Sequence, residues 1–208
     1  MRYRKEPGFS LVEALVVIAI ALTIAALSVP HVISEVRAYR LNSGASALAG
    51  YGSMARMKAA SQFAPFRLNI DTTSGTFSME KLCGDTPSSS DSNCSGGVNP
   101  YSQFTIPAIE LGTQYIPSGD SLLSCRPSGV SAYPGDITAD AAGCPAVMQV
   151  YFNTRGVPVN NAGGPIANGG TAVYLSDGNG LVDAVTFSLG GRVAVWTWSS
   201  SSSQWLMR

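Results

Sequence analysis

The first feature of the chain is an uninterrupted run of apolar residues close to its N-terminus. No charged residue lies between Ala14 and Ser34, a stretch of 21 residues rich in leucine, isoleucine, valine and alanine. At about 1.5 Å per helical residue this stretch is about 30 Å long, which matches the hydrocarbon core of a bilayer. The pattern therefore predicts a helix, over residues 9–34, that spans a membrane once.

Beyond this run, apolar residues recur at spacings of three and four up to about residue 60, which is typical of one face of a helix. The residues of this face include Ala45, Leu48, Ala49, Met54 and Met57. The range 35–62 is therefore expected to continue the helix as an amphipathic segment. Three glycines weaken it by about 1 kcal/mol each relative to alanine, so a packed domain must cover its apolar face. They are Gly44, Gly50 and Gly52.

From Pro65 onward, short apolar or alternating runs are separated by glycine, proline, asparagine and serine, which is typical of strands and turns. The predicted strands are Phe66 to Ile70, Thr76 to Leu82, Gln103 to Ile109, Val147 to Asn153, Ala172 to Ser176, Ala184 to Leu189 and Arg192 to Trp198. Turns are predicted at Ser74-Gly75 and Gly190-Gly191, and long polar loops at 85–100 and 159–170. We expect an α+β fold in which one antiparallel β-domain, residues 63–208, packs on the C-terminal half of a long helix.

Charge is scarce and unevenly placed. Only 12% of the residues are charged, and 13 basic residues balance 13 acidic ones, which excludes a highly charged disordered chain. Arg2, Arg4 and Lys5 precede the apolar run, so the positive-inside rule predicts a cytoplasmic N-terminus. The chain after about Arg37 is then expected on the far side of the membrane.

Four cysteines fit an oxidising compartment. They lie in loop-like sequence and lack the C-x-x-C spacing of zinc ribbons and redox motifs, so disulfides are favoured over metal ligation. Three pairings are open to Cys83, Cys94, Cys125 and Cys144. The nearest-neighbour set, Cys83 with Cys94 and Cys125 with Cys144, closes the shortest loops.

One carboxylate, Glu13, lies inside the apolar segment. A charge at the bilayer centre costs about 2.5 to 3.5 kcal/mol and normally marks a function with a partner of opposite charge. A cleaved secretory signal does not explain it, because the only A-x-A-like triplet, Ala19 to Ala21, lies in the middle of the run. A plain anchor does not explain it either, which leaves an anchor with special processing. The alternative for Glu13 alone is a side chain that reaches the membrane interface without a partner.

The residues around Glu13 resemble the processing motif of type IV prepilins and type II secretion pseudopilins. The matching sequence is Gly8-Phe9-Ser10-Leu11-Val12-Glu13-Ala14-Leu15-Val16-Val17-Ile18-Ala19-Ile20, preceded by a short basic leader. The resemblance implies that the leader, residues 1–8, is cut after Gly8 and that Phe9 is then N-methylated. It also implies that Glu13, the fifth mature residue, pairs with the terminal amine of a neighbouring subunit.

The C-terminal region is similar to the GspH/FimT-type minor pseudopilins and minor pilins, in which a helix carries two small antiparallel sheets. The matching segments are Val150 to Pro158, with its Arg-Gly turn, and Val185 to Val195, with its closing hairpin. The resemblance implies a structural subunit near the start or tip of a type II secretion pseudopilus or a type IV pilus. The implied partners are prepilin peptidase/N-methyltransferase, other pilins or pseudopilins and the inner-membrane assembly platform. The implied location is the bacterial inner membrane, with a periplasmic C-terminal domain.

Other chemistry finds little support in the sequence. The only histidine, His31, lies beside the membrane, no nucleophile, phosphate-binding or metal motif occurs, and the carboxylates are scattered, so we expect no enzyme, cofactor or metal. The oxygen-rich segment Asp177 to Asp183 is interpreted as a turn in preference to a calcium loop, since it lacks further acidic ligands. Trp196, Trp198 and Trp205 are interpreted as sheet-capping residues in preference to an exposed binding face.

The alternative function is a pilus-tip module that binds DNA or a surface ligand. Its candidate residues are Arg155 and Arg192. The DNA-binding relatives place a second arginine two residues after the first, and this chain has Ala194 there. The region after residue 36 is also balanced in charge, whereas DNA binding needs a basic surface. The sequence therefore disfavours nucleic acid as a partner.

Overall fold

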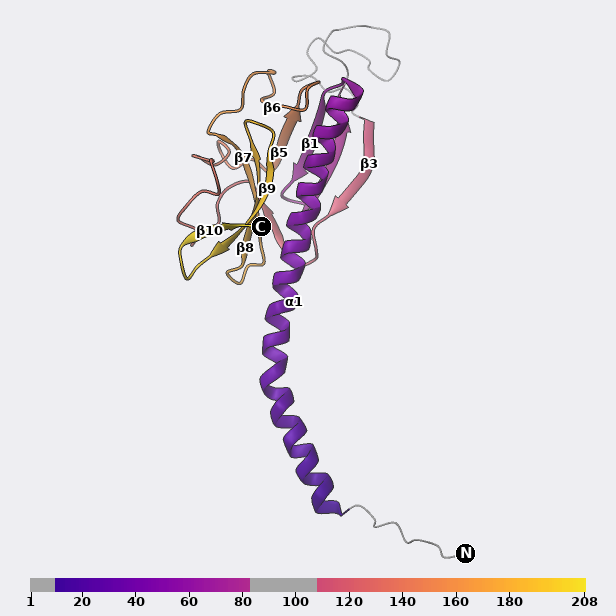
Figure 1. The fold of residues 1–208 in the computed structure, drawn as a ribbon, viewed down its shortest axis with the longest axis vertical. Helices are drawn as coiled ribbons and strands as arrows, with labels where there is room; N and C mark the ends of the chain where they lie inside the picture. The colour runs from indigo at the N-terminus through magenta and orange to yellow at the C-terminus, as the bar shows by residue number, and fades with distance from the viewer. Residues whose placement is uncertain (1–9, 83–107) are drawn as a thin grey trace, which may run out of the picture. The chain divides into compact units, whose positions relative to one another are not determined.

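The computed structural model describes residues 10–82 and 108–208, apart from the side chains of Pro30 and residues 108–112. Within these residues one helix, α1 (Leu11–Gln62), precedes all the strands (Figure 1). The chain divides into two compact units, residues 1–39 and residues 40–208, so α1 contributes to both. The helix is continuous through Pro30 from Leu11 to Gln62. Residue 9, the predicted start, lies outside the described residues, and the boundary at 34/35 stays a prediction.

The first part of α1 presents apolar side chains to its surroundings on every side. Leu11, Leu22 and Leu27 are 81%, 64% and 80% exposed, and the other large side chains up to Val36 are similarly open. This helix is long and apolar enough to cross a membrane. Because burying such a side chain is worth about 1.5 to 3 kcal/mol, this part of the chain requires lipid or neighbouring helices around it.

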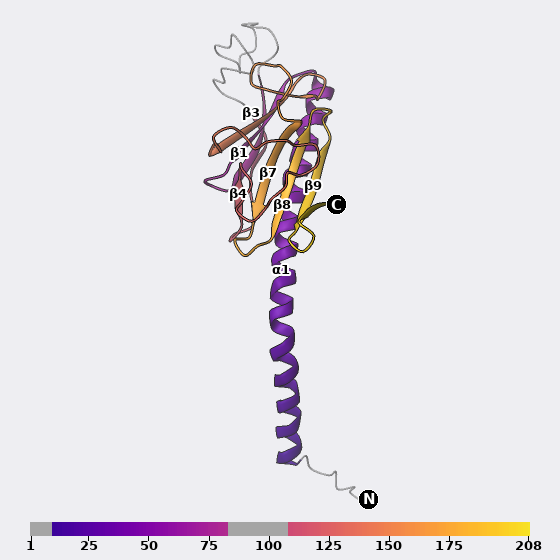
Figure 2. The ribbon, with the colours of Figure 1, turned by 90° about the vertical axis from the view of Figure 1, so that its left-hand side faces the viewer.

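The second unit contains two antiparallel five-stranded sheets in the part of the chain that is described. The first sheet has the order β3-β2-β1-β5-β6 and the second the order β10-β9-β8-β7-β4 (Figures 1 and 2). The strands of the first are β1 (Phe66–Asp71), β2 (Thr76–Lys81), β3 (Ala108–Tyr115), β5 (Val147–Phe152) and β6 (Pro158–Val159). The strands of the second are β4 (Ser121–Leu123), β7 (Gly170–Ser176), β8 (Val182–Ser188), β9 (Val193–Ser199) and β10 (Gln204–Met207).

A single core joins α1 to both sheets. The helix contributes small and medium side chains at helical spacing, namely Leu41, Ala45, Leu48, Ala55 and Ala59, all buried. The first sheet contributes Phe66, Leu68, Ile70, Phe77, Met79, Met148, Val150 and Phe152, and the second contributes Leu122, Val173, Leu175, Val185 and Phe187. The fold is thus the expected pilin-like α+β arrangement.

The predicted strands agree with the observed ones except at β3 and at three short edge strands. β4, β6 and β10 were not predicted, because they have only 3, 2 and 4 residues and little alternation. β3 begins at Ala108 and continues to Tyr115, so the expected strand 103–109 is correct only at its end, and residues 103–107 lie outside the described part. The expected loop 159–170 is mostly turns, although β6 includes its first residue and Val159 forms an isolated bridge with Pro165.

The serine-rich segment after β9 is a hairpin turn, which pairs β9 with β10. This pairing brings the tryptophans of the two strands together as a cap on the sheet. Trp198 and Trp205 are opposite each other in the β9–β10 register, with ring centroids 5.4 Å apart and an edge-on arrangement. Trp198 is only 7% exposed. Trp196 donates from Nε1 to Oγ1 of Thr186 at 2.9 Å. The sheet-capping interpretation is therefore confirmed.

Two of the three helical glycines have a packing role that their sequence positions did not reveal. Gly52 is buried, and a Cβ at this position would overlap the ring of Phe187. Gly44 lies against Pro117 and Leu175. A Cβ at this position would be 3.1 Å from Pro117 and 3.2 Å from Leu175. Gly50, in contrast, is exposed and has no atom within 4 Å of that position.

This difference predicts opposite effects of the same substitution. Gly52→Ala is expected to lower the free energy of unfolding by about 1 to 3 kcal/mol, because α1 must move away from Phe187. Gly50→Ala is the matched control and is expected to raise it by up to about 1 kcal/mol through helix propensity alone. Denaturant unfolding of the full chain in detergent measures both, and equal effects at the two positions would contradict the packing role of Gly52.

Candidate functional site

Glu13 occupies the first turn of α1. The helix begins with the bond from the backbone N–H of Ala14 to the carbonyl oxygen of Ser10, at 3.1 Å. A carboxylate here lies at the positive end of the helix dipole, which stabilises it. Gly8 and Phe9, the residues of the predicted cut, lie outside the described part of the chain.

The Glu13 side chain is exposed and is surrounded by exposed apolar residues such as Val12, Val16 and Val17. Within the described residues it has no hydrogen bond or ion pair. A carboxylate in such a setting is costly in lipid unless a cation on another chain pairs with it. The next acidic residue of the helix, Glu35, differs because it lies 4.0 Å from Nδ1 of His31, one helical turn away.

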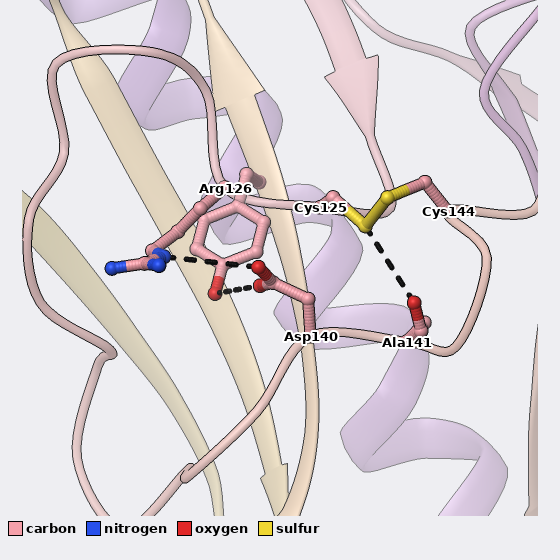
Figure 3. The surroundings of a disulfide bond; sticks show 6 residues. Cys125, Arg126, Asp140, Ala141 and Cys144 are labelled. Carbon is pink, nitrogen blue, oxygen red and sulfur yellow. Dashed lines mark hydrogen bonds and ion pairs between the residues drawn. A yellow bond between two sulfur atoms is a disulfide. The ribbon is translucent and has the colours of Figure 1, made fainter.

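A disulfide lies at the base of the loop between β4 and β5. Cys125 and Cys144 are bonded, and their Cα atoms are 5.4 Å apart (Figure 3). This bond belongs to the nearest-neighbour set considered from the sequence, whereas Cys83 and Cys94 lie outside the described residues. A closed loop of this length restricts the unfolded chain and stabilises the fold by about 3 kcal/mol.

A polar cluster fastens the same loop to the second sheet. Asp140 accepts a hydrogen bond from the Tyr174 hydroxyl at 2.9 Å, and its other oxygen lies 3.7 Å from Nε of Arg126. The arginine also lies over the ring of Tyr133, at 4.0 Å from its centroid. Burial, together with Asp140, raises the pKa of the Tyr174 hydroxyl, so it remains a donor at any physiological pH. Figure 3 shows the Arg126 side chain directed toward Asp140.

Arg56 was not singled out from the sequence, yet it connects α1 to two turns. Its Nη1 donates to the carbonyl oxygen of Gly191 at 2.8 Å, in the β8–β9 turn. Gly156, in the turn between β5 and β6, has φ 71°, and a Cβ there would lie 2.7 Å from the carbonyl oxygen of Arg56. The two glycines therefore allow both turns to approach the helix.

The two candidate ligand-binding arginines lie in these turns, Arg155 between β5 and β6 and Arg192 between β8 and β9. Arg155 is exposed, and its backbone N–H bonds to Oδ1 of Asn153 at 3.0 Å. Arg192 is also exposed, and its guanidinium contacts the sulfur of Met207 in β10. In the described residues no carboxylate pairs with Arg155, Arg192 or Arg56. The structure therefore brings the backbones of the two turns together beside Arg56 but directs Arg192 toward β10.

The segment Asp177 to Asp183 forms a turn in which one side-chain oxygen of Asp177 bonds within the turn, while the other, Oδ2, is buried and has no hydrogen-bond partner among the described residues. Oδ1 of Asp177 accepts the backbone N–H groups of Asn179 and Leu181, at 2.8 and 2.9 Å. Asp183 is 2% exposed, and burial raises the pKa of its carboxyl. Among the residues that the structure describes, no group of three or more acidic, histidine or cysteine side chains is placed to hold a metal.

One buried ion pair was missed among carboxylates that the sequence left unassigned. Arg67 and Glu80 face each other in the β1–β2 register, are 7% and 5% exposed and form a direct ion pair through Nε and Oε2. This pair could have been predicted from the sequence, because a two-strand hairpin with its turn at Ser74-Gly75 places positions 67 and 80 opposite each other. Their side chains point away from α1, because the alternate residues Phe66 and Leu68 point toward it.

Comparison with known proteins agrees with the N-terminal segment. The chain matches the prokaryotic N-terminal methylation motif over residues 3–29. A search of curated proteins finds no match. Among solved structures the chain is similar to the minor pseudopilin EpsH of the Vibrio cholerae type 2 secretion system, with 10% identity, a TM-score of 0.43 and coverage of 76% of this chain and 97% of that one. It is also similar to the type IV minor pilin FimU of Pseudomonas aeruginosa, with 14% identity, a TM-score of 0.44 and coverage of 80% and 92%.

The class of the protein follows from its own features. A long N-terminal apolar helix, whose second part packs against antiparallel sheets, is a pilin-like fold. The methylation motif occupies the N-terminal end of the same chain. The chain therefore combines a prokaryotic N-terminal methylation motif with a fold of the pilin-like class.

The disulfide gives a direct test of how the β4–β5 loop is held. Replacing both Cys125 and Cys144 by serine is expected to lower the free energy of unfolding by about 3 kcal/mol, because the loop is no longer closed in the unfolded chain. Denaturant unfolding measures the loss. The single variants, which leave one free thiol each, should lose the same amount, and a double variant as stable as the parent would contradict the bond.

Proposed function

We propose that this protein is a minor pilin or minor pseudopilin, processed after Gly8 and assembled through its N-terminal helix into a type IV pilus or a type II secretion pseudopilus. The observation that carries the proposal is the position of Glu13. It is a charged residue in the first turn of α1, in a part of the helix that is otherwise apolar and exposed, and it lies within the methylation motif. Such a carboxylate needs a cation as its partner in lipid, and the described residues of this chain supply none.

Cleavage after Gly8 would create that partner. It would make Phe9 the first residue, and its amine, a cation, would lie four residues before Glu13. Within one helix these two groups lie about one turn apart. Between two parallel helices the amine of an incoming chain can reach the carboxylate of the previous one. Each helix would then satisfy one charge of its neighbour inside the lipid.

The exposed apolar surface of α1 supports the same assembly. Apolar side chains that are exposed on every side of a helix can pack against lipid or against similar helices. The subunit can therefore pass from the bilayer into a bundle of such helices without exposing these side chains to water. The β-domain would then be carried on the outside of the filament. The corresponding partners are prepilin peptidase/N-methyltransferase, other pilins or pseudopilins and an inner-membrane assembly platform.

The membrane orientation belongs to the same proposal. The basic residues before α1 favour a cytoplasmic N-terminus, and the Cys125–Cys144 disulfide favours an oxidising compartment for the C-terminal domain. Together they support a single-pass inner-membrane protein with a periplasmic domain before assembly.

Glu13→Gln is expected to leave membrane insertion intact but to reduce incorporation into filaments at least about tenfold, since the neighbouring amine loses its counter-charge. The measurement is the ratio of sheared filament to membrane fractions, by quantitative immunoblotting. Glu35→Gln is the matched control, because Glu35 is an exposed carboxylate of the same helix that already has a local partner, and it should assemble normally. Equal incorporation of both variants would remove Glu13 from assembly.

Gly8→Ala is expected to block leader removal, because the peptide bond after Gly8 is the proposed cut. Intact-mass spectrometry of the membrane fraction should show a chain that retains residues 1–8 and carries no methyl group on Phe9. Ser10→Ala, just past the cut, should be processed normally. A normal mature mass for Gly8→Ala would exclude the proposed processing site.

A further inference from the structure

One sheet edge in the described chain is only partly covered. In the first sheet, β5 pairs with β1 along its whole length, but on its other side it pairs with β6 only through Tyr151 and Phe152. The first half of β5, Val147 to Val150, therefore has a partner on one side alone. Beside it lies a groove of about 330 Å³.

The hydrogen-bonding direction of this half-strand follows from its two ends. Before β5, the backbone N–H of Thr72 donates to the carbonyl oxygen of Ala146 at 2.8 Å, on the β1 side. After β5, the N–H of Asn153 donates to the carbonyl oxygen of Val157 at 3.0 Å, on the β6 side. Backbone groups alternate between the two sides of an antiparallel strand, so even-numbered residues face β1 and odd-numbered residues face β6.

Two odd-numbered residues, Val147 and Gln149, thus direct their N–H and C=O groups into the groove. In the part of the chain that the structure describes, no hydrogen bond is found for these four groups. Native proteins usually protect such an edge with lysine, proline or a bulge. Here neither residue is charged, Val147 is 46% exposed and Gln149 is exposed as well.

The shape and charge of the groove determine what it can take. It is bounded by the end of the disulfide loop, by the turn after β6 and by β7, at Ala141, Pro145, Asn160, Asn161, Ile166 and Thr171. The groove lies between these segments, and its volume of about 330 Å³ suits a short extended segment laid beside β5. None of the lining residues is acidic or basic, and a charged side chain inserted there would lose its hydration without a counter-charge.

We propose that this groove binds an extended, uncharged segment of another protein, which adds to the first sheet as a strand beside β5. The backbone groups of Val147 and Gln149 supply the hydrogen bonds, and the apolar and amide walls select against charge. The binding site is separate from Glu13 and α1, so it goes beyond filament assembly and does not depend on it.

Gln149→Pro tests the strand addition. Proline removes the N–H that faces the groove, and it leaves the bonds to β1 intact because they come from even-numbered residues. Gln149→Ala is the matched control, because it also loses the glutamine side chain but keeps the N–H. Thermal unfolding of both full-length variants checks that β5 is retained.

The readout is photocrosslinking in the producing cells, with p-benzoylphenylalanine in place of Asn161, an exposed residue of the groove wall. We expect an adduct in the parent and in Gln149→Ala that falls to background in Gln149→Pro. Mass spectrometry should map it to a segment of another protein without charged residues at the crosslink. An adduct that persists in Gln149→Pro, an adduct to a second copy of this chain, or no adduct in the parent would each overturn the proposal.

Amide hydrogen exchange keeps the test valid if Gln149→Pro is poorly folded. In the parent protein alone the amides of Val147 and Gln149 should exchange rapidly, while those of Met148 and Val150 are protected. In the purified crosslinked complex all four should be protected. Rapid exchange of Val147 and Gln149 in that complex would exclude strand addition.

Discussion

The contact between the second part of α1 and the two sheets is the interaction on which the rest of the structure depends. The helix offers a narrow stripe of small residues, and two aromatic-rich sheets share it. Gly52 is the closest point of this packing, because the Phe187 ring occupies the space that a side chain would fill. Both sheets pack on this one helix, and Arg56 of the same helix bonds to the turn that follows β8.

This packing divides the tasks of a single helix. Upstream of Arg40 its large apolar side chains are exposed, and downstream its small and medium side chains fill a protein core. The first part is apolar on every side, whereas the second is apolar on one face only. Residue size changes as well, from leucine and isoleucine in the first part to alanine and glycine in the second, where a sheet must approach closely.

The sequence predicted the long elements of the fold well because their patterns are local. The spacing of apolar residues predicts the helix, the two hairpin turns and the strands with clear alternation. Glu13 and its motif can be identified because they lie in one contiguous stretch of sequence. β4 and β6 could not be predicted, because their pairing depends on distant strands and not on their own residues. The role of Arg56 was equally hidden, since its partner, the carbonyl oxygen of Gly191, is 135 residues away. The pairing of Arg67 with Glu80 could have been predicted, but only from the register of the hairpin. The open edge of β5 could not be predicted without knowing where β6 ends.

The Cys125–Cys144 disulfide has a consequence for when the protein becomes competent to bind. Ala141 lies inside the closed loop and Pro145 directly follows it, and both form one wall of the groove beside β5. That wall is therefore set by a covalent bond that cytosolic thiol reductants oppose and an oxidising compartment favours. On the proposed topology, oxidation would act as a maturation step: a newly made chain would lack the closed loop until its C-terminal domain had been exported, which would separate synthesis from association with extended polypeptides inside the cell.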